Sequence, residues 1–256
     1  MDLTLSSFES LDGFPGVHMA VDIAILTVSD EDENSERHLQ TLLFKRDAGF
    51  QAGQWMLPGR FVRENQRLSE AATICLAEKA GIIGFKPRQL VVLDDPKRDP
   101  RGWTMTVGHV VAVPYSVALE AVAQDPDHRF LATLREREVV FNNSQAELPL
   151  DHQKILDSAV NYLRSKYFSS PDPRNFLEEV FTLPDLYAVH CAVLGPDVYS
   201  RDSFRRTFEK QLEPLDETRS VGVGKPAMLY RKAARVSGRL PRRISTWSPS
   251  RISDKG

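Results

Sequence analysis

The sequence predicts an α/β protein of two domains: an α/β/α sandwich followed by a smaller domain of short helices and a β-hairpin. Three observations support this prediction. Apolar, β-branched runs at residues 21–28 and 41–46 indicate buried strands. A loop, an Ala-rich helix and a closing glycine follow at residues 57–82. A Pro- and Ser-rich stretch at residues 169–173 then separates this pattern from short helices and a basic hairpin.

The rest of the first domain alternates strands with polar loops. Two further strands are expected at residues 90–93 and 105–113, on either side of a charged loop. A helix at residues 145–167 closes the domain, and we assign no special role to its His152, which has no ligand partner at metal-binding spacing. Residues 1–17 carry no strong periodic pattern and form a lead-in.

The second domain begins with two helices. Thr182 stands where a helix N-cap is expected, and an apolar face continues from there to Gly195. A short turn leads to a second helix at residues 200–210, in which Phe204 and Phe208 are spaced to pack inward. Two helices joined by a short turn are typical of a helix-turn-helix.

A hairpin follows the second helix. Residues 212–215 start a strand or turn, residues 219–224 form a basic, Gly-flanked loop, and residues 226–231 read as the returning strand. Helix, turn, basic helix and hairpin together resemble a winged helix-turn-helix DNA-binding domain, in which the hairpin is the wing.

Composition places the chain among ordinary soluble globular proteins. It has 256 residues, 41% of them hydrophobic and 27% charged. It has no run of about 20 apolar residues, the length of a membrane span, and no signal-peptide pattern at its start. Cys75 and Cys191 lie far apart on predicted helices. We therefore expect a cytoplasmic protein without disulfides or a membrane partner.

Charge is distributed unevenly along the chain. The whole chain has a formal charge of −2, but residues 201–256 hold 14 Lys and Arg against 6 Asp and Glu. Such an excess points to an anionic partner at this end. We divide the chain into a first domain at 1–168, a second at 174–234, and a basic tail at 235–256 that is too polar to fold by itself.

The loop and helix at residues 57–82 resemble the Nudix box, the signature of enzymes that hydrolyse nucleoside diphosphates linked to another moiety. A Pro58-Gly59 turn opens it and Gly81 closes it. In that family, an Arg-Glu pair, a Glu-Glu pair and a further loop Glu surround the catalytic magnesium. Magnesium requires hard oxygen ligands, so the chemistry depends on these carboxylates.

This chain departs from the Nudix pattern at the positions that matter most. The loop Glu falls on Gln66, the Arg-Glu pair on Ile74 and Cys75, and the Glu-Glu pair on Glu78 and Lys79. Neutral, thiol and cationic side chains do not suit magnesium. The sequence therefore predicts neither a catalytic residue nor a metal site, and no cofactor.

Three further segments extend the resemblance. The loop before residue 105 ends in Asp-Pro-Arg-Gly at residues 99–102, similar to Nudix proteins that handle ADP-ribose and to the regulators derived from them. Together with residues 181–187 and 224–230, this loop resembles the NrtR family, and the resemblance covers most of residues 20–232. NrtR proteins are Nudix-related repressors of NAD biosynthesis and salvage genes in bacteria.

The resemblance implies a homodimer that binds double-stranded operator DNA and is released by ADP-ribose, although NAD or ATP would suit the same site. A pyrophosphate held without metal needs cations and backbone N–H groups, and an adenine needs a stacking ring. The expected ligand-binding residues are Arg46, Trp55, Pro58, Gly59, Phe61, Arg63, Glu78, Lys79 and Arg101.

For DNA, the second helix would enter the major groove with its N-terminal residues nearest the bases. We expect Arg201, Ser203, Arg205 and Arg206 there. Residues that contact phosphates position the protein without reading sequence. We expect Lys210, Arg219, Lys225 and Arg231 in that role.

Two alternatives stay open at this point. The first is an active Nudix hydrolase that cleaves ADP-ribose or a similar nucleoside diphosphate, with Glu70 and Glu78 as its best carboxylates. The second is an interaction scaffold with no small ligand. A ligand at 100 times its Kd would stabilise the fold by about 2.7 kcal/mol, so a scaffold predicts no thermal shift with nucleotides.

Overall fold

The computed structural model describes residues 16–135, 138–141, 144–220 and 226–233. Residues 1–15 of the lead-in expected at 1–17 lie outside this range, as do Lys225 of the wing loop and the tail at residues 235–256. Among the described residues, no helix is both long and apolar enough to cross a membrane.

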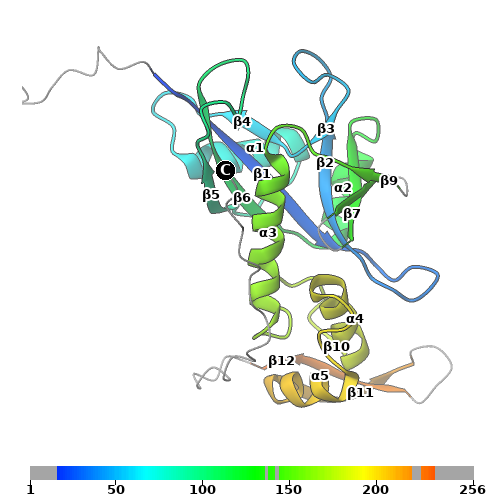
Figure 1. The fold of residues 1–256 in the computed structure, drawn as a ribbon. Coiled ribbons are helices and arrows are strands. Elements are labelled where there is room, and N and C mark those ends of the chain that lie inside the picture. Colours follow the sequence, from blue (N-terminus) through cyan, green and yellow to red (C-terminus); the bar gives the residue numbers. More distant parts are fainter. Residues whose placement is uncertain (1–15, 136–137, 142–143, 221–225, 234–256) are drawn as a thin grey trace, which may run out of the picture.

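A mixed β-sheet forms the centre of the first domain (Figure 1). Its main path runs β5-β6-β1-β2-β7-β8-β9, while β3 pairs with β2 and β4 pairs with β1. Neighbours pair antiparallel except β1 and β6, which run parallel. The strands are β1 (His18–Val28), β2 (Leu39–Lys45), β3 (Trp55–Met56), β4 (Gly59–Phe61), β5 (Arg88–Leu93), β6 (Thr104–Ala112), β7 (Arg129–Arg135), β8 (Glu138–Phe141) and β9 (Ser144–Ala146).

Helices cover both faces of this sheet. α1 (Leu68–Ala80) and α2 (Tyr115–Ala123) pack on one face, against β1 side chains that include Ile23 and Ile25. The alternate residues Ala24 and Leu26 point to the other face, which α3 (His152–Tyr167) covers. Since successive strand residues face opposite sides, one continuous apolar run serves both layers. This arrangement confirms the predicted α/β/α sandwich.

Gly108 of β6 explains how closely α3 approaches the sheet. A Cβ atom at this position would lie 2.9 Å from Cγ2 of Ile155 on α3 and 2.9 Å from Cγ1 of Val91. Such distances are too short for carbon atoms in contact, so only glycine allows the helix to pack here.

Two parts of the first domain differ from the sequence prediction. The helix expected at residues 145–167 begins only at His152, because Ser144–Ala146 pairs as β9 and Leu150 then adopts a positive φ of 57° in the turn. The helix α2 and the strands β7 and β8 were not predicted, since their apolar runs are short and are flanked or interrupted by charged residues.

The second domain has the predicted winged-helix elements. α4 (Leu183–Leu194) and α5 (Arg201–Phe208) are joined by a turn, and a 3₁₀ turn (Glu209–Gln211) extends α5. Thr182 caps α4 as expected, since its Oγ1 accepts from the backbone N–H of Asp185 at 3.2 Å. β10 (Phe181–Thr182), β12 (Ala227–Lys232) and β11 (Leu212–Arg219) form a small antiparallel sheet.

α3 connects the two domains. Its first half packs on the large sheet, and near its end Arg164 donates to the carbonyl of Val193 in α4 at 3.0 Å (Figure 1). The Pro-rich junction that follows is ordered by Asp172, which is buried and accepts from the Tyr167 hydroxyl at 2.7 Å and the Phe176 N–H at 3.1 Å. One apolar core therefore continues from the sheet through α3 into the winged helix.

His190 lies at the centre of the winged-helix core. Its ring packs against Tyr167, Phe204 and Phe208 with centroid distances of 5.1, 4.9 and 4.5 Å. Its Nε2 donates to the carbonyl of Pro171, while its buried Nδ1 has no hydrogen-bond partner among the residues that the structure describes. Burial lowers the pKa of His190 from 6.5 to about 4. Protonating Nδ1 would place a charge in an aromatic core.

The winged helix is therefore expected to lose stability in acid. Because the folded-state pKa of His190 is depressed, its stabilising contribution is complete above pH 6.5 and is lost as pH falls towards 4. The loss amounts to about 3 kcal/mol. Urea unfolding across this pH range measures it, and His190→Phe should flatten that part of the profile. His128→Gln is the control. The pKa of exposed His128 is raised by its hydrogen bond to Asp125, so replacing this histidine cannot reduce the loss of stability in acid.

Candidate functional site

A cavity of about 470 Å³ opens where β1, β4 and the start of α3 meet. Its lining comes from segments far apart in the sequence, and basic side chains outnumber acidic ones. The lining residues are Ala20, Asp22, Phe44, Lys45, Arg46, Asp47, Ala48, Met56, Leu57, Pro58, Gly59, Arg60, Phe61, Lys79, Arg98, Asp99, Arg101, Leu150 and His152.

Asp22 of β1 is a buried carboxylate on the cavity wall. Its Oδ2 accepts a hydrogen bond from Thr106 Oγ1 at 2.7 Å. The side chain fits because its neighbour on β4 is Gly59, where a Cβ atom would lie 1.9 Å from Asp22 Oδ1. Gly59 therefore allows β4 to pass directly over the carboxylate. Sequence analysis missed Asp22, since a lone acid within an apolar strand gives no motif.

A buried ion pair fixes the loop after β5 to the start of α3. Arg98 Nε and Nη2 donate to the two oxygens of Asp151 at 2.9 and 2.6 Å, and both residues are more than nine-tenths buried. The Asp151 hydrogen bond raises the pKa of Arg98 against the opposing effect of burial. Arg98 Nη2 also lies 3.9 Å from Asp22 Oδ2. Paired in this way, the guanidinium and its carboxylates form one polar cluster.

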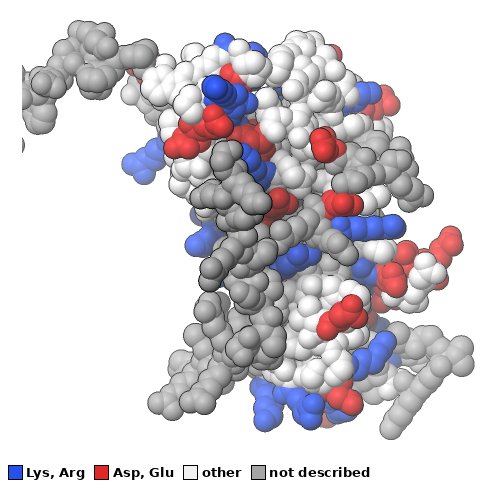
Figure 2. All heavy atoms as spheres, viewed as in Figure 1, with Lys and Arg blue, Asp and Glu red and all other residues white. Residues whose placement is uncertain are grey.

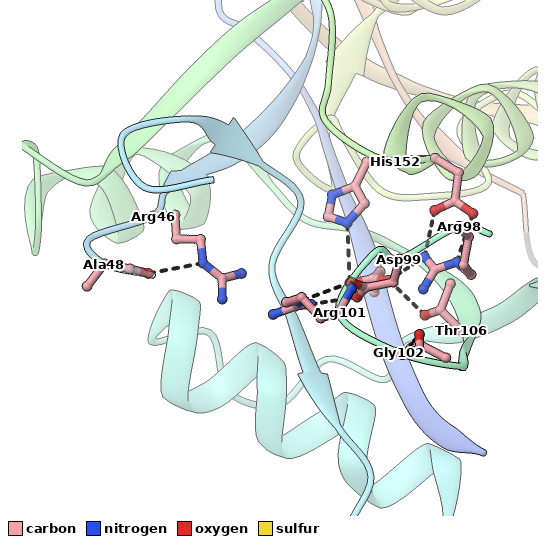
Figure 3. Close-up of polar contacts among 11 residues, drawn as sticks. Arg46, Ala48, Arg98, Asp99, Arg101, Gly102, Thr106 and His152 are labelled. Atoms are coloured by element: carbon pink, nitrogen blue, oxygen red, sulfur yellow. Dashed lines mark hydrogen bonds and ion pairs between the residues drawn. The ribbon is translucent and has the colours of Figure 1, made fainter. Parts of the chain in front are cut away.

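His152, the first residue of α3, completes this cluster (Figure 3). Its Nδ1 is 3.1 Å from the backbone N–H of Leu57. Because a backbone N–H can only donate, Nδ1 must accept and the ring proton lies on Nε2. Nε2 faces Asp22 Oδ1 at 3.7 Å. The structure thus gives His152 a buried place on the cavity wall, where sequence analysis assigned it no role.

Arg101 lies at the more exposed edge of the cavity. It forms two side-chain hydrogen bonds to Asp99, at 2.9 and 2.6 Å, which hold the pKa of that carboxyl below its usual range. Its guanidinium also lies over the exposed rings of Phe50 and Phe61, at 5.4 and 5.9 Å. This edge of the cavity therefore combines a fixed cation with aromatic surface.

The cavity brings together six of the nine predicted ligand-binding residues. Arg46 lies apart from the His152 cluster, where its Nε donates to the carbonyl of Ala48 at 3.2 Å (Figure 3). Lys79 has no carboxylate within 4 Å in the described part of the chain. The six are Arg46, Pro58, Gly59, Phe61, Lys79 and Arg101.

The other three predicted residues lie outside the cavity lining. Trp55 packs on the ring of Phe130 with centroids 5.9 Å apart. Arg63 is exposed in the loop before α1. Glu78 is exposed and pairs with Arg60, whose Nη1 lies 2.8 Å from its Oε2. Glu78 therefore partly neutralises a cation at the cavity instead of facing its interior.

The positions that hold magnesium in Nudix enzymes have other partners here. Gln66 Oε1 accepts from the Arg63 N–H at 3.1 Å, and Glu70 Oε2 caps α1 by accepting from the Arg67 N–H at 3.1 Å. Cys75 is buried, which raises the pKa of its thiol to about 12. Within the described residues, three metal-ligating side chains meet only at exposed Asp32 and Glu36 with half-buried His38, outside α1. The side chains on α1 do not fit magnesium.

A second basic surface lies on the winged helix. Phe204 and Phe208 face its core, as predicted, while Arg201, Arg205, Arg206 and Lys210 are exposed. In Figure 2, Lys and Arg side chains gather at the lower end of the molecule, where Figure 1 places α5. Cations on the face of a helix suit a polyanion.

The predicted DNA-binding residues differ in how far they are already paired. Arg205 forms two hydrogen bonds to Glu209 at 3.0 Å, and Arg231 two to Glu213 at 2.9 Å. Arg219 pairs with Asp185, and Ser203 Oγ donates to the carbonyl of Ser200 at 2.9 Å. Arg206 and Lys210 have no carboxylate within 4 Å among the described residues.

Comparison with known proteins agrees with this organisation. Residues 173–232 match the model of the NrtR DNA-binding winged helix domain. Over 232 residues, the chain is 30% identical to the ADPR responsive transcriptional repressor NtrR of Acinetobacter baylyi, an alignment that covers 90% of this chain and 87% of the relative. The chain belongs to the NrtR family.

Solved structures support the same fold. The NrtR of Shewanella oneidensis in complex with a 27mer DNA is 29% identical, with a TM-score of 0.67 over 84% of this chain and 93% of that one. A MutT/nudix family protein of Enterococcus faecalis superposes with a TM-score of 0.68 at 20% identity, over 88% of this chain and 90% of that one. This NrtR homologue thus joins a Nudix-like domain to a winged helix.

The Arg98–Asp151 pair should be essential to the stability of this NrtR chain. Removing one partner of a buried ion pair leaves an unpaired charge and costs about 3–5 kcal/mol. We expect this loss for Arg98→Met and for Asp151→Leu alone, and a smaller one for the double variant. Urea unfolding gives all three free energies. The exposed pair Arg231–Glu213 is the control, because Arg231→Met should cost less than about 1 kcal/mol. If the single variants lost equal free energies of unfolding and the double variant lost their sum, this view would be contradicted.

Proposed function

We propose that this chain is a transcriptional repressor whose Nudix-like domain binds ADP-ribose and whose winged helix binds operator DNA, releasing it when the ligand binds. The observation that supports the proposal is that three features occur in one chain. They are a cation-lined cavity, a helix α1 whose side chains do not fit magnesium, and a basic winged helix. The relative from A. baylyi is named for the same response. The proposed genes, from the family resemblance, are those of NAD biosynthesis and salvage.

The cavity suits a pyrophosphate held by protein cations. Arg46, Lys79 and Arg101 line it, and Lys79 stands where a Nudix enzyme has a metal-binding carboxylate. A lysine there repels a divalent cation but attracts a phosphate. We therefore propose that the ligand binds without metal or other cofactor. Gly59 and Pro58 shape the wall beside it.

The same side chains argue against the hydrolase alternative. A Nudix enzyme needs carboxylates converging on one metal, but Glu70 is occupied in capping α1 and Glu78 in pairing with Arg60. We propose that the chain does not hydrolyse ADP-ribose. The assay is AMP release with magnesium or manganese, and turnover that is lost in Glu78→Gln would contradict this view.

On the DNA side, we propose that α5 enters the major groove and that the wing contacts the backbone. Arg201, Ser203, Arg205 and Arg206 are the proposed base-reading residues on α5. Two copies would read two half-sites about one or two helical turns apart, so we propose a homodimer. Residues 1–168 serve as the sensor and 174–234 as the DNA-binding domain.

We propose that α3 couples ligand binding in the cavity to DNA binding by the winged helix. His152 at its first turn lines the cavity, and Arg164 near its last turn donates to Val193 of the winged helix. A ligand that shifts the start of a rigid helix also shifts its end, because the helix is packed along its length.

The first prediction from this proposal concerns ligand-gated DNA binding. Fluorescence anisotropy with labelled DNA from upstream of NAD biosynthesis genes should show saturable binding that ADP-ribose reverses. Arg46→Ala should raise the ADP-ribose concentration needed for release about tenfold, as expected for a lost charge-assisted contact. Lys86→Ala, at an exposed position outside the cavity lining, should change nothing. DNA binding unaffected by ADP-ribose would contradict the sensor, and an unchanged thermal midpoint with any nucleotide would favour the scaffold.

A second prediction concerns the α5 surface. Arg206→Ala should weaken operator binding about 10- to 100-fold, because Arg206 is exposed and has no carboxylate partner in the described part of the chain. Lys86→Ala, at an exposed position in the Nudix-like domain, is the charge-matched control and should leave affinity unchanged. Equal effects of the two substitutions would contradict groove entry by α5. Both are read by the same anisotropy titration at fixed salt.

A further inference from the structure

The buried end of the cavity holds a donor and an acceptor that face each other without bonding. His152 Nε2 carries the ring proton, since Nδ1 accepts from Leu57, and it lies 3.7 Å from Asp22 Oδ1. That distance is too long for a hydrogen bond. Asp22 Oδ1 receives no hydrogen bond from any described residue, because Thr106 donates to Oδ2 instead. Asp22 and His152 are only 7% and 4% exposed.

The donor at His152 Nε2 and the acceptor at Asp22 Oδ1 suit a ligand atom that can accept and donate a hydrogen bond at once. Buried polar atoms are nearly always hydrogen-bonded, and leaving them unpaired destabilises the protein. A hydroxyl both accepts and donates, so a single hydroxyl oxygen near the pair can accept from His152 Nε2 and donate to Asp22 Oδ1. An ether or phosphate oxygen can only accept, and beside Asp22 a phosphate would add a like charge. The pair therefore suits an oxygen that both accepts and donates, and among the parts of ADP-ribose this oxygen is a hydroxyl.

We propose that Asp22 and His152 form a hydroxyl-binding subsite that takes the terminal ribose of ADP-ribose. This assignment rests on the proposed function. The exposed rings that suit adenine, Phe50 and Phe61, lie against Arg101 at the edge of the cavity, whereas Asp22 and His152 are buried. The terminal ribose is the part of ADP-ribose furthest from adenine, so it reaches the buried pair.

The surrounding residues hold the pair ready for this role. Leu57 fixes the tautomer of His152, Thr106 fixes the carboxylate of Asp22, and Gly59, which has no side chain, lets β4 pass close to Oδ1 without a clash. Neither side chain has to reorganise to meet a hydroxyl, which favours tight and selective binding. Because His152 is the first residue of α3, a sugar bound here contacts the helix that leads to the winged helix. The subsite thus couples ligand identity to the connecting helix.

Two substitutions at His152 separate its donor from its structural role. His152→Asn keeps an oxygen near the position of Nδ1 for the Leu57 N–H but removes the Nε2 donor. His152→Gln places an amide N–H near Nε2 and gives up the Leu57 contact. Asp22→Asn keeps an oxygen for Thr106 and replaces the acceptor that faces His152. Thermal unfolding and anisotropy on operator DNA establish that each variant is folded.

The test compares ADP-ribose with ADP, which lacks the terminal ribose and carries an additional phosphate charge in its place, by isothermal titration calorimetry on the full chain. The wild type should bind ADP-ribose about 10- to 100-fold more tightly than ADP, the effect expected for hydrogen bonds to a charged group. Asp22→Asn and His152→Asn should bring this ratio close to one with little change for ADP. His152→Gln should retain most of the ratio, and Lys86→Ala, at an exposed position outside the cavity lining, should keep all of it.

The outcomes distinguish the subsite from the function on which it rests. A folded wild-type chain that binds no ADP-ribose would overturn both. Tight ADP-ribose binding whose preference over ADP survives in Asp22→Asn and His152→Asn would overturn the subsite alone. Equal losses for ADP and ADP-ribose in His152→Asn would overturn the assignment to the terminal ribose. If Asp22→Asn does not fold, the His152→Asn and His152→Gln pair decides.

Discussion

The packing of α3 is the constraint on which the rest of this structure depends. One helix covers a face of the large sheet, holds the cavity cluster at its first turn and packs against α4 near its last. Gly108 and the Arg98–Asp151 pair fix its position at the sheet, while Tyr167, Asp172 and His190 fix it at the winged helix. Since these contacts form a single core, neither end of the helix can move independently of the other.

The side chains of α1 explain why this Nudix-like domain suits the proposed sensor better than a hydrolase. A Nudix hydrolase holds magnesium with carboxylates on the helix of its Nudix box. In this chain that helix is α1, which carries a buried thiol at Cys75 and a cation at Lys79. Cations that replace a metal stabilise a bound pyrophosphate but supply no activated water. The proposed binding without turnover would give a state that persists as long as the ligand is present, and a switch requires such a state.

Sequence patterns predicted those parts of the fold that depend on local chemistry. The apolar run of β1, the glycines of the box and the cap at Thr182 are each encoded within a few residues. The cavity cluster could not be predicted in this way. Asp22, Arg98 and His152 are separated by tens of residues, and each looks ordinary until the sheet brings them together. Short elements such as α2 and β9 were also missed, because long-range pairing decides them more than local propensity.

The central claim is that the cavity and the winged helix share one equilibrium. Thermodynamic linkage makes such coupling reciprocal: if ADP-ribose weakens operator binding by some factor, bound operator must weaken ADP-ribose binding by the same factor. The direct measurement is the Kd of ADP-ribose by calorimetry with the free protein and with the protein saturated by operator DNA. We expect the ligand to bind the complex more weakly, by the factor found in the DNA titration. An identical Kd in both states would contradict the account, because cavity and winged helix would then act independently.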